Sequence, residues 1–184
     1  MKLIQQSIPD VLLIEPIVHR DKRGYFVETF RQDMLDQALG YKINFIQDNE
    51  SESISKGVLR GLHYQSPPYT QSKLVRVIKG RILDVAVDIR QDSPTFGRHI
   101  TVELSEQNKR QLFLPCGFAH GFAVLSEGAI FSYKVDEYFS AEHNEGIAYN
   151  DKDIAIDWCL SERDIKLSIQ DENNSNLTDK KKLL

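Results

Sequence analysis

Short runs in which hydrophobic and polar residues alternate follow one another along most of the chain, and turn-forming residues separate them. The clearest run covers residues 82–90, where Leu83, Val85 and Val87 fall on one face and Asp84 falls on the other. Side chains of a β-strand alternate between its two faces. This run therefore predicts a strand with one apolar face and a second face that meets a wet cavity or solvent.

Repetition of this pattern predicts an all-β protein. About ten short strands, spaced roughly 8–12 residues apart, are typical of a β-sandwich or barrel. We expect strands at residues 2–8, 11–15, 25–30, 43–47, 57–65, 74–78, 82–89, 97–104, 111–114, 118–125 and 129–139. Helices do not alternate with these strands, which argues against a parallel sheet built from βαβ units.

Turn and helix signals predict several connections. The turn at Lys79 and Gly80 is expected to join its flanking strands as a hairpin, because glycine supplies the positive φ that a tight turn needs. Residues 31–39 are the best helix candidate, ended by Gly40 as a C-cap. The first two strands are expected at sheet edges, and residues 48–56 are expected to form a polar loop.

We expect one domain over residues 1–171 and a polar tail over residues 172–184. A chain of 184 residues with 41% hydrophobic content can bury the core of a single domain. Trp158 is expected to anchor the last part of the domain, and a helix is expected after Ser161. Beyond Asp171 the sequence is polar and unpatterned, so the tail is expected to be flexible or loosely docked.

Composition and charge argue against several kinds of partner. A formal net charge of −4 does not suit a nucleic-acid-binding surface. No run approaches the roughly 20 apolar residues of a membrane span, and no export signal pattern is present. Cys116 and Cys159 lie far apart and form no CxxC pair, so we expect a protein of the reducing cytoplasm.

The densest group of candidate functional residues lies within residues 57–90. His63 stands there with Arg60 and Lys73 nearby, and Gly61 allows a close backbone approach. A lone strand histidine is often structural, but these neighbouring cations favour a functional site. By alternation His63 and Arg60 fall on opposite faces, so both enter one cavity only if a β-bulge resets the alternation. We predict that bulge near Gly61.

Three further side chains have two interpretations each. Lys73 is either a solvated lysine at a strand end or a cation in a cavity, where it would stabilise an oxyanion or a phosphate. Tyr133 is either a rim residue or a proton donor to a carbanion. His120 shares a strand face with Phe118 and Phe122, which is compatible with a packed core residue or with a functional one.

His63 and His120 are also the candidate metal ligands. Tyr64 and Gln65 follow His63 where a metal site would need a second histidine or a carboxylate, so we expect no metal. We also expect no redox cofactor, because the glycine-rich dinucleotide signature is absent from the sequence.

Several long motifs occur in order between residues 8 and 158. They are RGYFVE (23–28), QDN (47–49), GVLRGLHYQ (57–65), DVAVDIR (84–90) with SPTFG (93–97), and PCGFAHGF (115–122). Together they resemble the dTDP-4-dehydrorhamnose 3,5-epimerase family. The resemblance implies a cupin-type jelly-roll β-sandwich, free of metal, that forms a homodimer in which N-terminal strands join the partner's sheet.

The same resemblance implies a substrate and a set of roles. The substrate would be dTDP-4-dehydro-6-deoxy-D-glucose, inverted at C3 and C5 to dTDP-4-dehydro-6-deoxy-L-mannose on the way to dTDP-L-rhamnose. His63 would be the general base, Tyr133 the acid on the opposite face of the sugar, and Lys73 the cation beside the enolate oxygen. Phe26 and Tyr138 would stack on the thymine. The implied substrate contacts are Arg23, Phe26, Glu28, Gln47, Asp48, Asn49, Arg60, Lys73, His120, Tyr138 and Asn144.

Two departures from the family pattern concern the sugar end of the site. The family's aspartate that orients the base lies in an LSxKD stretch, and here LSIQD has Gln170 for the lysine and ends at Asp171. Asp164 ends a competing match, LSERD, but it lies closer to Trp158 than the family spacing allows, so we assign the role to Asp171. Asn144 stands where the family has a glutamate.

These departures leave two alternatives open. The chain could epimerise C3 alone, or isomerise another nucleotide-linked 4-keto-6-deoxy sugar. A cupin-like sugar-binding module without catalysis would use the same arginines and aromatic residues, but it would have no use for His63 opposite Tyr133.

Overall fold

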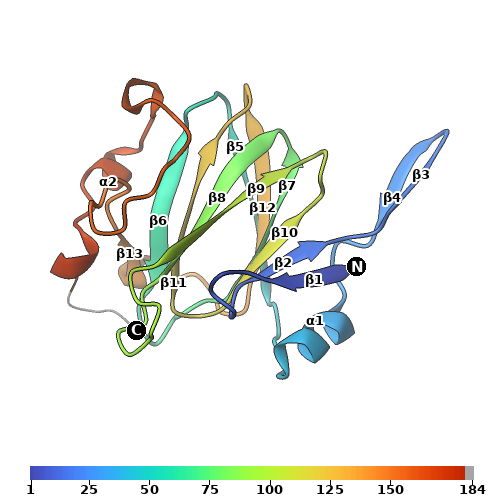
Figure 1. Ribbon diagram of the computed structural model, residues 1–184, viewed down its shortest axis with the longest axis horizontal. Coiled ribbons are helices and arrows are strands. Elements are labelled where there is room, and N and C mark those ends of the chain that lie inside the picture. The colour runs from blue at the N-terminus through green and yellow to red at the C-terminus, as the bar shows by residue number, and fades with distance from the viewer. Residues whose placement is uncertain (181–184) are drawn as a thin grey trace.

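Two antiparallel sheets lie face to face and form most of the protein (Figure 1). The computed structural model describes residues 1–180. The six-stranded sheet has the order β1 (Lys2–Gln5), β2 (Leu12–Glu15), β10 (Gln111–Leu114), β7 (Lys73–Lys79), β12 (Ala129–Val135), β5 (Gln47–Ser53). The five-stranded sheet has the order β13 (Asn144–Gly146), β6 (Leu59–Gln65), β11 (Phe118–Val124), β8 (Arg81–Asp88), β9 (His99–Ser105). The predicted all-β, jelly-roll type of sandwich is confirmed.

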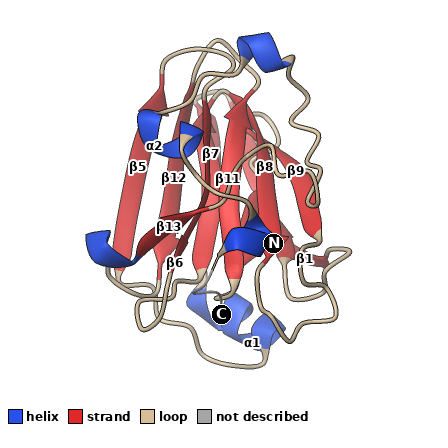
Figure 2. Ribbon diagram, turned by 90° about the vertical axis from the view of Figure 1, so that its left-hand side faces the viewer, coloured by secondary structure: helices blue, strands red, loops and turns tan. Residues whose placement is uncertain are grey.

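The remaining elements are short. Strands β3 (Val18–Asp21) and β4 (Gly24–Val27) form a separate hairpin. The helices of the described residues, blue in Figure 2, are α1 (Gln32–Leu39) and α2 (Ile169–Glu172), with 3₁₀ turns η1 (Ala141–His143), η2 (Glu162–Asp164) and η3 (Leu177–Asp179). Among the described residues, no helix is both long and apolar enough to pass through a lipid bilayer.

Hydrophobic side chains gather in three layers. Between the sheets, Val75 of β7 packs in one cluster with Ala86 of β8 and Phe122 of β11. Outside the five-stranded sheet, strand residues pack with Trp158 and with the C-terminal segment, which Figure 1 shows in red beside β6. Outside the six-stranded sheet, Leu35 of α1 covers a third cluster. The interior layer leaves room for a pocket at one end of the sandwich.

The expected helix and the expected anchor are both confirmed. Helix α1 ends at Gly40, which adopts the left-handed conformation with φ 76° and donates its N–H to the Asp36 carbonyl. Only glycine takes this conformation without steric cost. Trp158 is 5% exposed, and its indole N–H donates to the Tyr149 carbonyl. After Ser161 the chain forms the short turn η2 rather than a regular helix.

The expected hairpin at Lys79 and Gly80 is wrong. The turn is present, with φ 83° at Gly80, but β7 and β8 belong to different sheets. A Cβ at Gly80 would lie 2.1 Å from the Gly128 carbonyl oxygen, so this corner packs closely against the β11–β12 connection. A tight turn can join two paired strands of one sheet, or it can join a strand of one sheet to a strand of the other. The alternation along a strand does not predict which strands pair with it.

The expected polar loop at residues 48–56 is also wrong, because most of it is strand β5. Burial alternates along β5 although all of its residues are polar. Asn49 and Ser51 line a pocket between the sheets, and Asp48 is exposed on the opposite face. An edge strand with a wet cavity on one side and solvent on the other needs no apolar residues, so its hydropathy resembles that of a loop.

Strand β1 lies at a sheet edge as expected, but β2 does not. β2 pairs with β1 on one side and with β10 on the other. Its side chains are buried on both faces, with Leu13 between the sheets and Ile14 in the cluster under α1. Strands β3 and β13 were not predicted.

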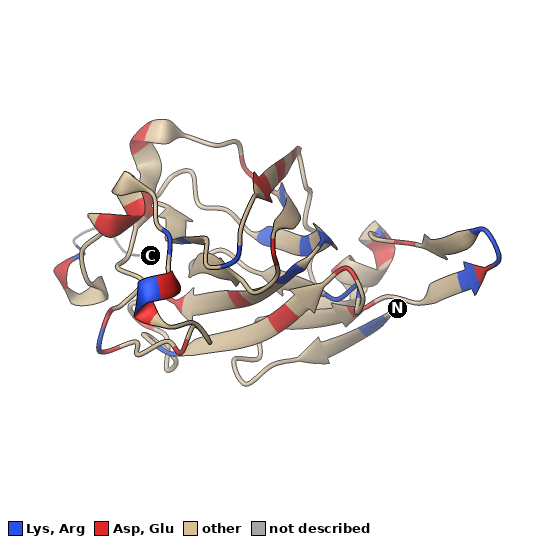
Figure 3. Cartoon of the chain, turned by 90° about the horizontal axis from the view of Figure 1, so that it is seen from above, with Lys and Arg blue, Asp and Glu red and all other residues tan. Residues whose placement is uncertain are grey.

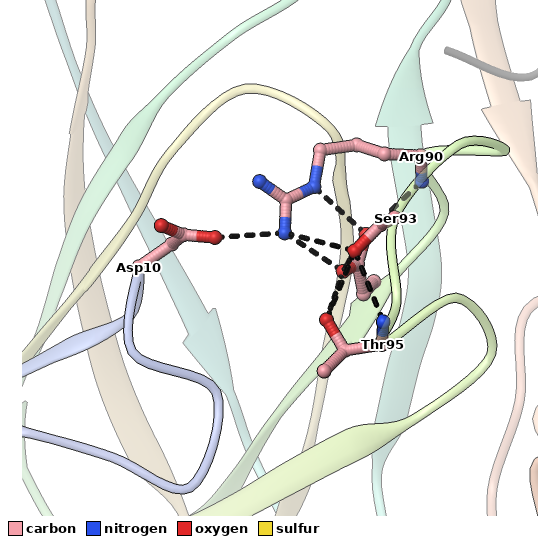
Figure 4. Close-up of polar contacts among 5 residues, drawn as sticks. Asp10, Arg90, Ser93 and Thr95 are labelled. Atoms are coloured by element: carbon pink, nitrogen blue, oxygen red, sulfur yellow. Dashed lines mark hydrogen bonds and ion pairs between the residues drawn. The ribbon is translucent and has the colours of Figure 1, made fainter.

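A network of charged and hydroxyl groups ties together connections at one end of the sandwich (Figure 4). Arg90 donates to both carboxylate oxygens of Asp88 and reaches Asp10 in the β1–β2 turn at 2.8 Å. Ser93 and Thr95 each donate to Asp88 at 2.6 Å. Asp88 is fully buried, so these bonds replace the water that its charge loses on folding.

The described part of the segment after Asp171, residues 172–180, packs against the rest of the domain. Leu177 is 4% exposed, and its backbone N–H donates to Asp151 at 2.7 Å. Residues 181–184 of the predicted tail lie outside the described residues.

Candidate active site

A pocket of about 730 Å³ opens between the two sheets. Side chains of the six-stranded sheet, the five-stranded sheet and the C-terminal segment all line it. Among them are most of the residues expected in the site: Asn49, Arg60, His63, Lys73, His120, Tyr133, Asn144 and Asp171. Residues that are up to 122 positions apart in the chain are thus brought to one cavity.

The predicted bulge near Gly61 is confirmed. His120 of β11 pairs with His63 of β6, but Phe122 pairs with Arg60, so β6 carries one extra residue between the two pairs. Gly61 has φ 120°, and a Cβ there would lie 2.6 Å from the Gly121 Cα. Both the backbone conformation and the close approach therefore require glycine. The bulge lets His63 and Arg60 line the same pocket.

His63 is held by a buried carboxylate. Its Nε2 lies 2.6 Å from Asp171 Oδ1, and Asp171 is 3% exposed, whereas Asp164 lies exposed in η2. Burial raises the pKa of Asp171, but hydrogen bonds and charge from His63 and a hydrogen bond from Ser168 outweigh it and lower the pKa below its usual value. An ionised carboxylate only accepts, so Nε2 carries the hydrogen and Nδ1 keeps a lone pair that can take a proton.

Tyr133 occupies the wall opposite His63. It belongs to β12 of the six-stranded sheet, whereas His63 belongs to β6 of the five-stranded sheet, and both line the pocket. Burial raises the pKa of Tyr133, and the charge of Arg60 opposes this only in part. The phenol therefore keeps its proton at neutral pH and can act as a donor.

A buried histidine–aspartate pair lies deeper in the pocket. His120 Nε2 lies 2.9 Å from Asp84 Oδ2, and Asp84 is fully buried. Asp84 Oδ1 has no hydrogen-bond partner among the described residues. Burial raises the pKa of Asp84, and the charges of His120 and Lys73 offset the shift in part. The polar position on the inner face of β8, beside Ala86, was the sequence signal for this carboxylate.

Lys73 is a partly buried cation of the pocket lining. Burial lowers its pKa from 10.5 to about 8, although the charge of Asp84 opposes the shift. An ammonium with a pKa near 8 is mostly charged at neutral pH and can also lose its proton readily. Lys73 is thus suited to stabilise negative charge that develops in the pocket.

Several expected contact residues lie outside the pocket. On the β3–β4 hairpin and just after it, Arg23, Phe26 and Glu28 are exposed, and Phe26 is 66% exposed. Asp48 points to the other face of its sheet, where it pairs with Lys134 at 2.7 Å.

Two others lie beside the pocket lining. The side-chain amide of Gln47 donates to Asn49 at 2.8 Å. Tyr138 is 62% exposed and precedes Phe139, which lines the pocket.

Sequence reasoning missed part of the lining. Gln65 and Gln71, together with Phe139 and Gln170, also face the pocket. Gln65 is 4% exposed, and its amide N–H lies 3.4 Å from Asn144 Oδ1. The LHYQ stretch did contain a signal, since an amide on a buried strand needs polar partners.

The described residues contain no group of three or more histidine, cysteine, aspartate or glutamate side chains that could hold a metal ion. Each of the two pocket histidines instead pairs with its own carboxylate.

A two-sheet jelly roll with a histidine and a tyrosine on facing walls of one pocket is compatible with a cupin-type enzyme of the isomerase class. A family model described as dTDP-4-dehydrorhamnose 3,5-epimerase matches residues 5–179. The chain therefore belongs to the dTDP-4-dehydrorhamnose 3,5-epimerase family, as the sequence motifs predicted.

Individual relatives agree over nearly the whole chain. The dTDP-4-dehydrorhamnose 3,5-epimerase of Shigella flexneri is 53% identical over 170 residues, which are 90% of this chain and 93% of that protein. The dTDP-6-deoxy-D-glucose-3,5-epimerase of Legionella pneumophila, solved with dTDP-4-keto-L-rhamnose, has a TM-score of 0.93 and 48% identity, and the match covers 97% of this chain and 93% of that one. A 3'-monoepimerase of Streptomyces bikiniensis, solved with dTDP-quinovose, has a TM-score of 0.86 and 33% identity, with 95% and 87% covered.

Proposed function

We propose that the protein is an epimerase that inverts C3 and C5 of dTDP-4-dehydro-6-deoxy-D-glucose. The product is dTDP-4-dehydro-6-deoxy-L-mannose, also called dTDP-4-dehydro-L-rhamnose, an intermediate of dTDP-L-rhamnose biosynthesis. The observation that carries the proposal is the presence of His63 and Tyr133 on facing walls of one pocket that also holds Lys73.

The chemistry of the substrate explains why these three side chains are needed. C3 and C5 both flank the C4 ketone, so a proton lost from either carbon leaves an enolate with its charge on the C4 oxygen. Inversion requires that the proton return from the other face of the ring. One base, one acid on the opposite side and one stabiliser of the oxygen form the smallest set that can do this.

His63 takes the proton in this reaction. Its Nδ1 is the ring nitrogen with a free lone pair, because Nε2 donates to Asp171. The same carboxylate stabilises the imidazolium that forms, since opposite charges at hydrogen-bond distance attract strongly in a partly buried site.

Tyr133 returns a proton from the opposite wall, because burial keeps its phenol protonated. Lys73 carries the positive charge that balances the enolate oxygen. A preorganised donor of this kind contributes about 3–4 kcal/mol to the stability of a transition state.

Exposed polar and aromatic groups near the pocket would bind the nucleotide. Arg60 is exposed at the lining and can meet a diphosphate, and Asn49 offers an amide. Phe26 and Tyr138 are the proposed thymine stack, and both rings are exposed.

A homodimer would bring the hairpin residues to a pocket. The β3–β4 hairpin projects from the sandwich in Figure 1, and Figure 3 shows charged residues at its tip. Its two strands pair with each other and, among the described residues, with no further strand. An isolated two-stranded hairpin is only marginally stable in water. Docked on a second copy, the hairpin would deliver Arg23 and Phe26 to the partner's pocket. β1 and β2 pair within their own chain, so this hairpin is the N-terminal segment available for exchange.

The reducing cytoplasm is the compartment that we propose for this activity. Cys116 and Cys159 are both free, as expected where thiols are kept reduced.

Epimerisation at C3 alone is the second candidate. The observation that favours it is the likeness to the 3'-monoepimerase, together with Asn144 in the pocket where the family has a glutamate.

Deuterium incorporation distinguishes the two candidates. The enzyme is incubated with the substrate in heavy water, and the sugar is then examined by NMR at each carbon. Deuterium at both C3 and C5, with formation of the L-manno product, is expected. Deuterium at C3 alone would establish the second candidate, and no deuterium at either carbon would contradict both.

A further inference from the structure

A serine hydroxyl holds the carboxylate that orients the base. Helix α2 has four residues and begins after Ser168, whose Oγ accepts the backbone N–H of Asp171 at 3.1 Å. The same Oγ donates its hydrogen to Asp171 Oδ2 at 2.9 Å. A hydroxyl has one donor and two acceptor sites, so it can make both bonds at once. An ordinary N-cap makes only the first of them.

The second bond fixes how the Asp171 carboxylate is turned. Ser168 holds Oδ2, and Oδ1 faces His63 at 2.6 Å. A backbone hydrogen bond from Gly61, in the bulge of β6, also reaches this carboxylate. With both oxygens held, the carboxylate plane cannot rotate away from the imidazole without losing a hydrogen bond inside a buried site.

Ser168 is itself tied to the strand that carries the base. Two residues before it, Lys166 donates its backbone N–H to the Gly57 carbonyl at 2.9 Å, and its own carbonyl accepts from Leu59 N–H at 3.0 Å. Leu59 is the first residue of β6, four positions before His63. The serine, the aspartate and the histidine therefore share one frame although they lie far apart in the sequence.

We propose that Ser168 is a positioning residue for the reaction, because its hydroxyl holds Asp171 Oδ2 so that Oδ1 keeps His63 in a single tautomer and orientation. This inference rests on the proposed function, in which His63 is the base. Neutral imidazole has two tautomers, and only the one with hydrogen on Nε2 leaves Nδ1 able to accept a proton. A carboxylate free to turn would hold that tautomer less strictly.

Three variants test the role of Ser168 through turnover. Ser168→Ala removes both bonds, and we expect kcat to fall at least about tenfold with KM changed by less than about twofold, because the base is misplaced and the nucleotide contacts are not. Ser168→Thr keeps the hydroxyl and should restore most of kcat. Ser161→Ala is the matched control, since Ser161 begins η2 without a side-chain cap bond and should leave both constants unchanged.

The His63 tautomer gives a measurement that needs no substrate. In protein labelled with ¹⁵N-histidine, two-bond ¹H–¹⁵N correlations report which ring nitrogen carries hydrogen, and His63→Gln assigns the signals. We expect the Nε2–H form in the unaltered protein and in Ser168→Thr, and a mixture of tautomers in Ser168→Ala. If Ser168→Ala does not fold, Ser168→Gly takes its place, because glycine at an N-cap costs only a few tenths of a kcal/mol relative to serine.

The two measurements separate the inference from the proposed function. Ser168→Ala with an unchanged kcat, or with an unchanged His63 tautomer, would overturn the role of Ser168 even if the epimerase activity is present. A protein without epimerase activity would overturn the proposed function, and the tautomer result would still decide whether Ser168 sets the state of His63.

Discussion

Burial gives two side chains of the pocket the protonation states that the proposed mechanism needs. It disfavours the charged form of any group, so it raises the pKa of the Tyr133 phenol and lowers that of the Lys73 ammonium. Tyr133 remains a proton donor, and Lys73 remains charged only below about pH 8. Asp171 shows the opposite outcome, because its hydrogen bonds outweigh burial and keep it ionised.

The pH dependence of turnover should reflect the loss of a proton from Lys73. In the proposed mechanism the ammonium stabilises the enolate, so kcat/KM should fall as the pH rises through about 8. In Lys73→Arg the guanidinium stays charged throughout this range, so the alkaline limb should move to higher pH even if the maximum rate is lower. If the fall in kcat/KM stays near pH 8 in Lys73→Arg, a group other than Lys73 causes it.

Replacement of Tyr133 should separate proton removal from proton return. Tyr133→Phe keeps the ring and loses the donor, so we expect product formation to fall at least about 100-fold while His63 still exchanges substrate protons with heavy water. NMR measures both in one sample. Tyr149→Phe, a change outside the pocket, is the control and should retain both reactions. Full product formation by Tyr133→Phe would remove the phenol from the mechanism.

At the scale of elements, one irregular strand and one loop network hold the site in place. The bulge in β6 turns His63 and Arg60 into the same cavity. The network around Asp88 joins the β1–β2 turn to the β8–β9 connection, and the Arg90 guanidinium also lies 4.8 Å above the ring of Phe118, where β11 begins.

Gly61→Ala should destabilise the protein strongly. The new Cβ would meet both the Gly121 Cα and the His120 carbonyl oxygen below 3 Å, in addition to the strain of a positive φ. We expect the free energy of unfolding in urea to fall by at least about 2 kcal/mol. Gly97→Ala is the matched control, because φ is also positive there but the nearest atom lies 3.8 Å away, so it should cost only about 1 kcal/mol. Equal losses of unfolding free energy in the two variants would mean that the close approach at Gly61 does not contribute to the cost of the substitution.

Arg90→Gln should lower stability in a pH-dependent way. Burial alone would raise the pKa of Asp88, but bonds from Arg90, Ser93 and Thr95 lower it to about 2. The resulting stabilisation is present above the unfolded pKa near 4 and is lost as the pH falls toward 2. We expect a loss of about 2–3 kcal/mol at pH 7, because a buried carboxylate loses its cation, and a smaller loss near pH 2.

The control for this pair is Asp10→Asn, which removes the half-exposed partner of Arg90 and should cost less than about 1 kcal/mol. Urea denaturation at several pH values measures all three proteins. A loss from Arg90→Gln that does not change between pH 7 and pH 2 would show that Asp88 is not the group affected.

At the scale of the whole molecule, the expected site is divided between two places. The proposed acid–base residues line the pocket, whereas Arg23 and Phe26 lie on the projecting hairpin. Two copies related by a two-fold axis would exchange hairpins equally, and each pocket would then be completed by its partner.

Mixed dimers should recover activity from two inactive proteins. One variant carries His63→Asn, and the other carries Arg23→Ala with Phe26→Ala. After subunit exchange half of the dimers are mixed, and each mixed dimer has one pocket with an intact base and an intact incoming hairpin, so we expect about a quarter of the unaltered activity. If the hairpin serves the pocket of its own chain, every pocket stays defective and mixing recovers nothing.

Much of the fold and part of the site could be predicted from local sequence. Alternation located most strands, Gly40 ended α1, and the parity conflict between His63 and Arg60 predicted the bulge that the structure contains. These features depend on the backbone geometry of a few consecutive residues, so the local sequence is sufficient to predict them. The long motifs, in turn, were sufficient to recognise the family.

Only the tertiary structure decided how those elements combine. It placed β7 and β8 in different sheets, made a strand of the polar residues in β5, and brought Asp171 to His63 across 108 positions. It also left the hairpin residues outside the pocket of their own chain. The physical reason is that alternation reports which face of a strand a side chain takes, whereas strand partners and site geometry depend on hydrogen bonds and packing between distant segments.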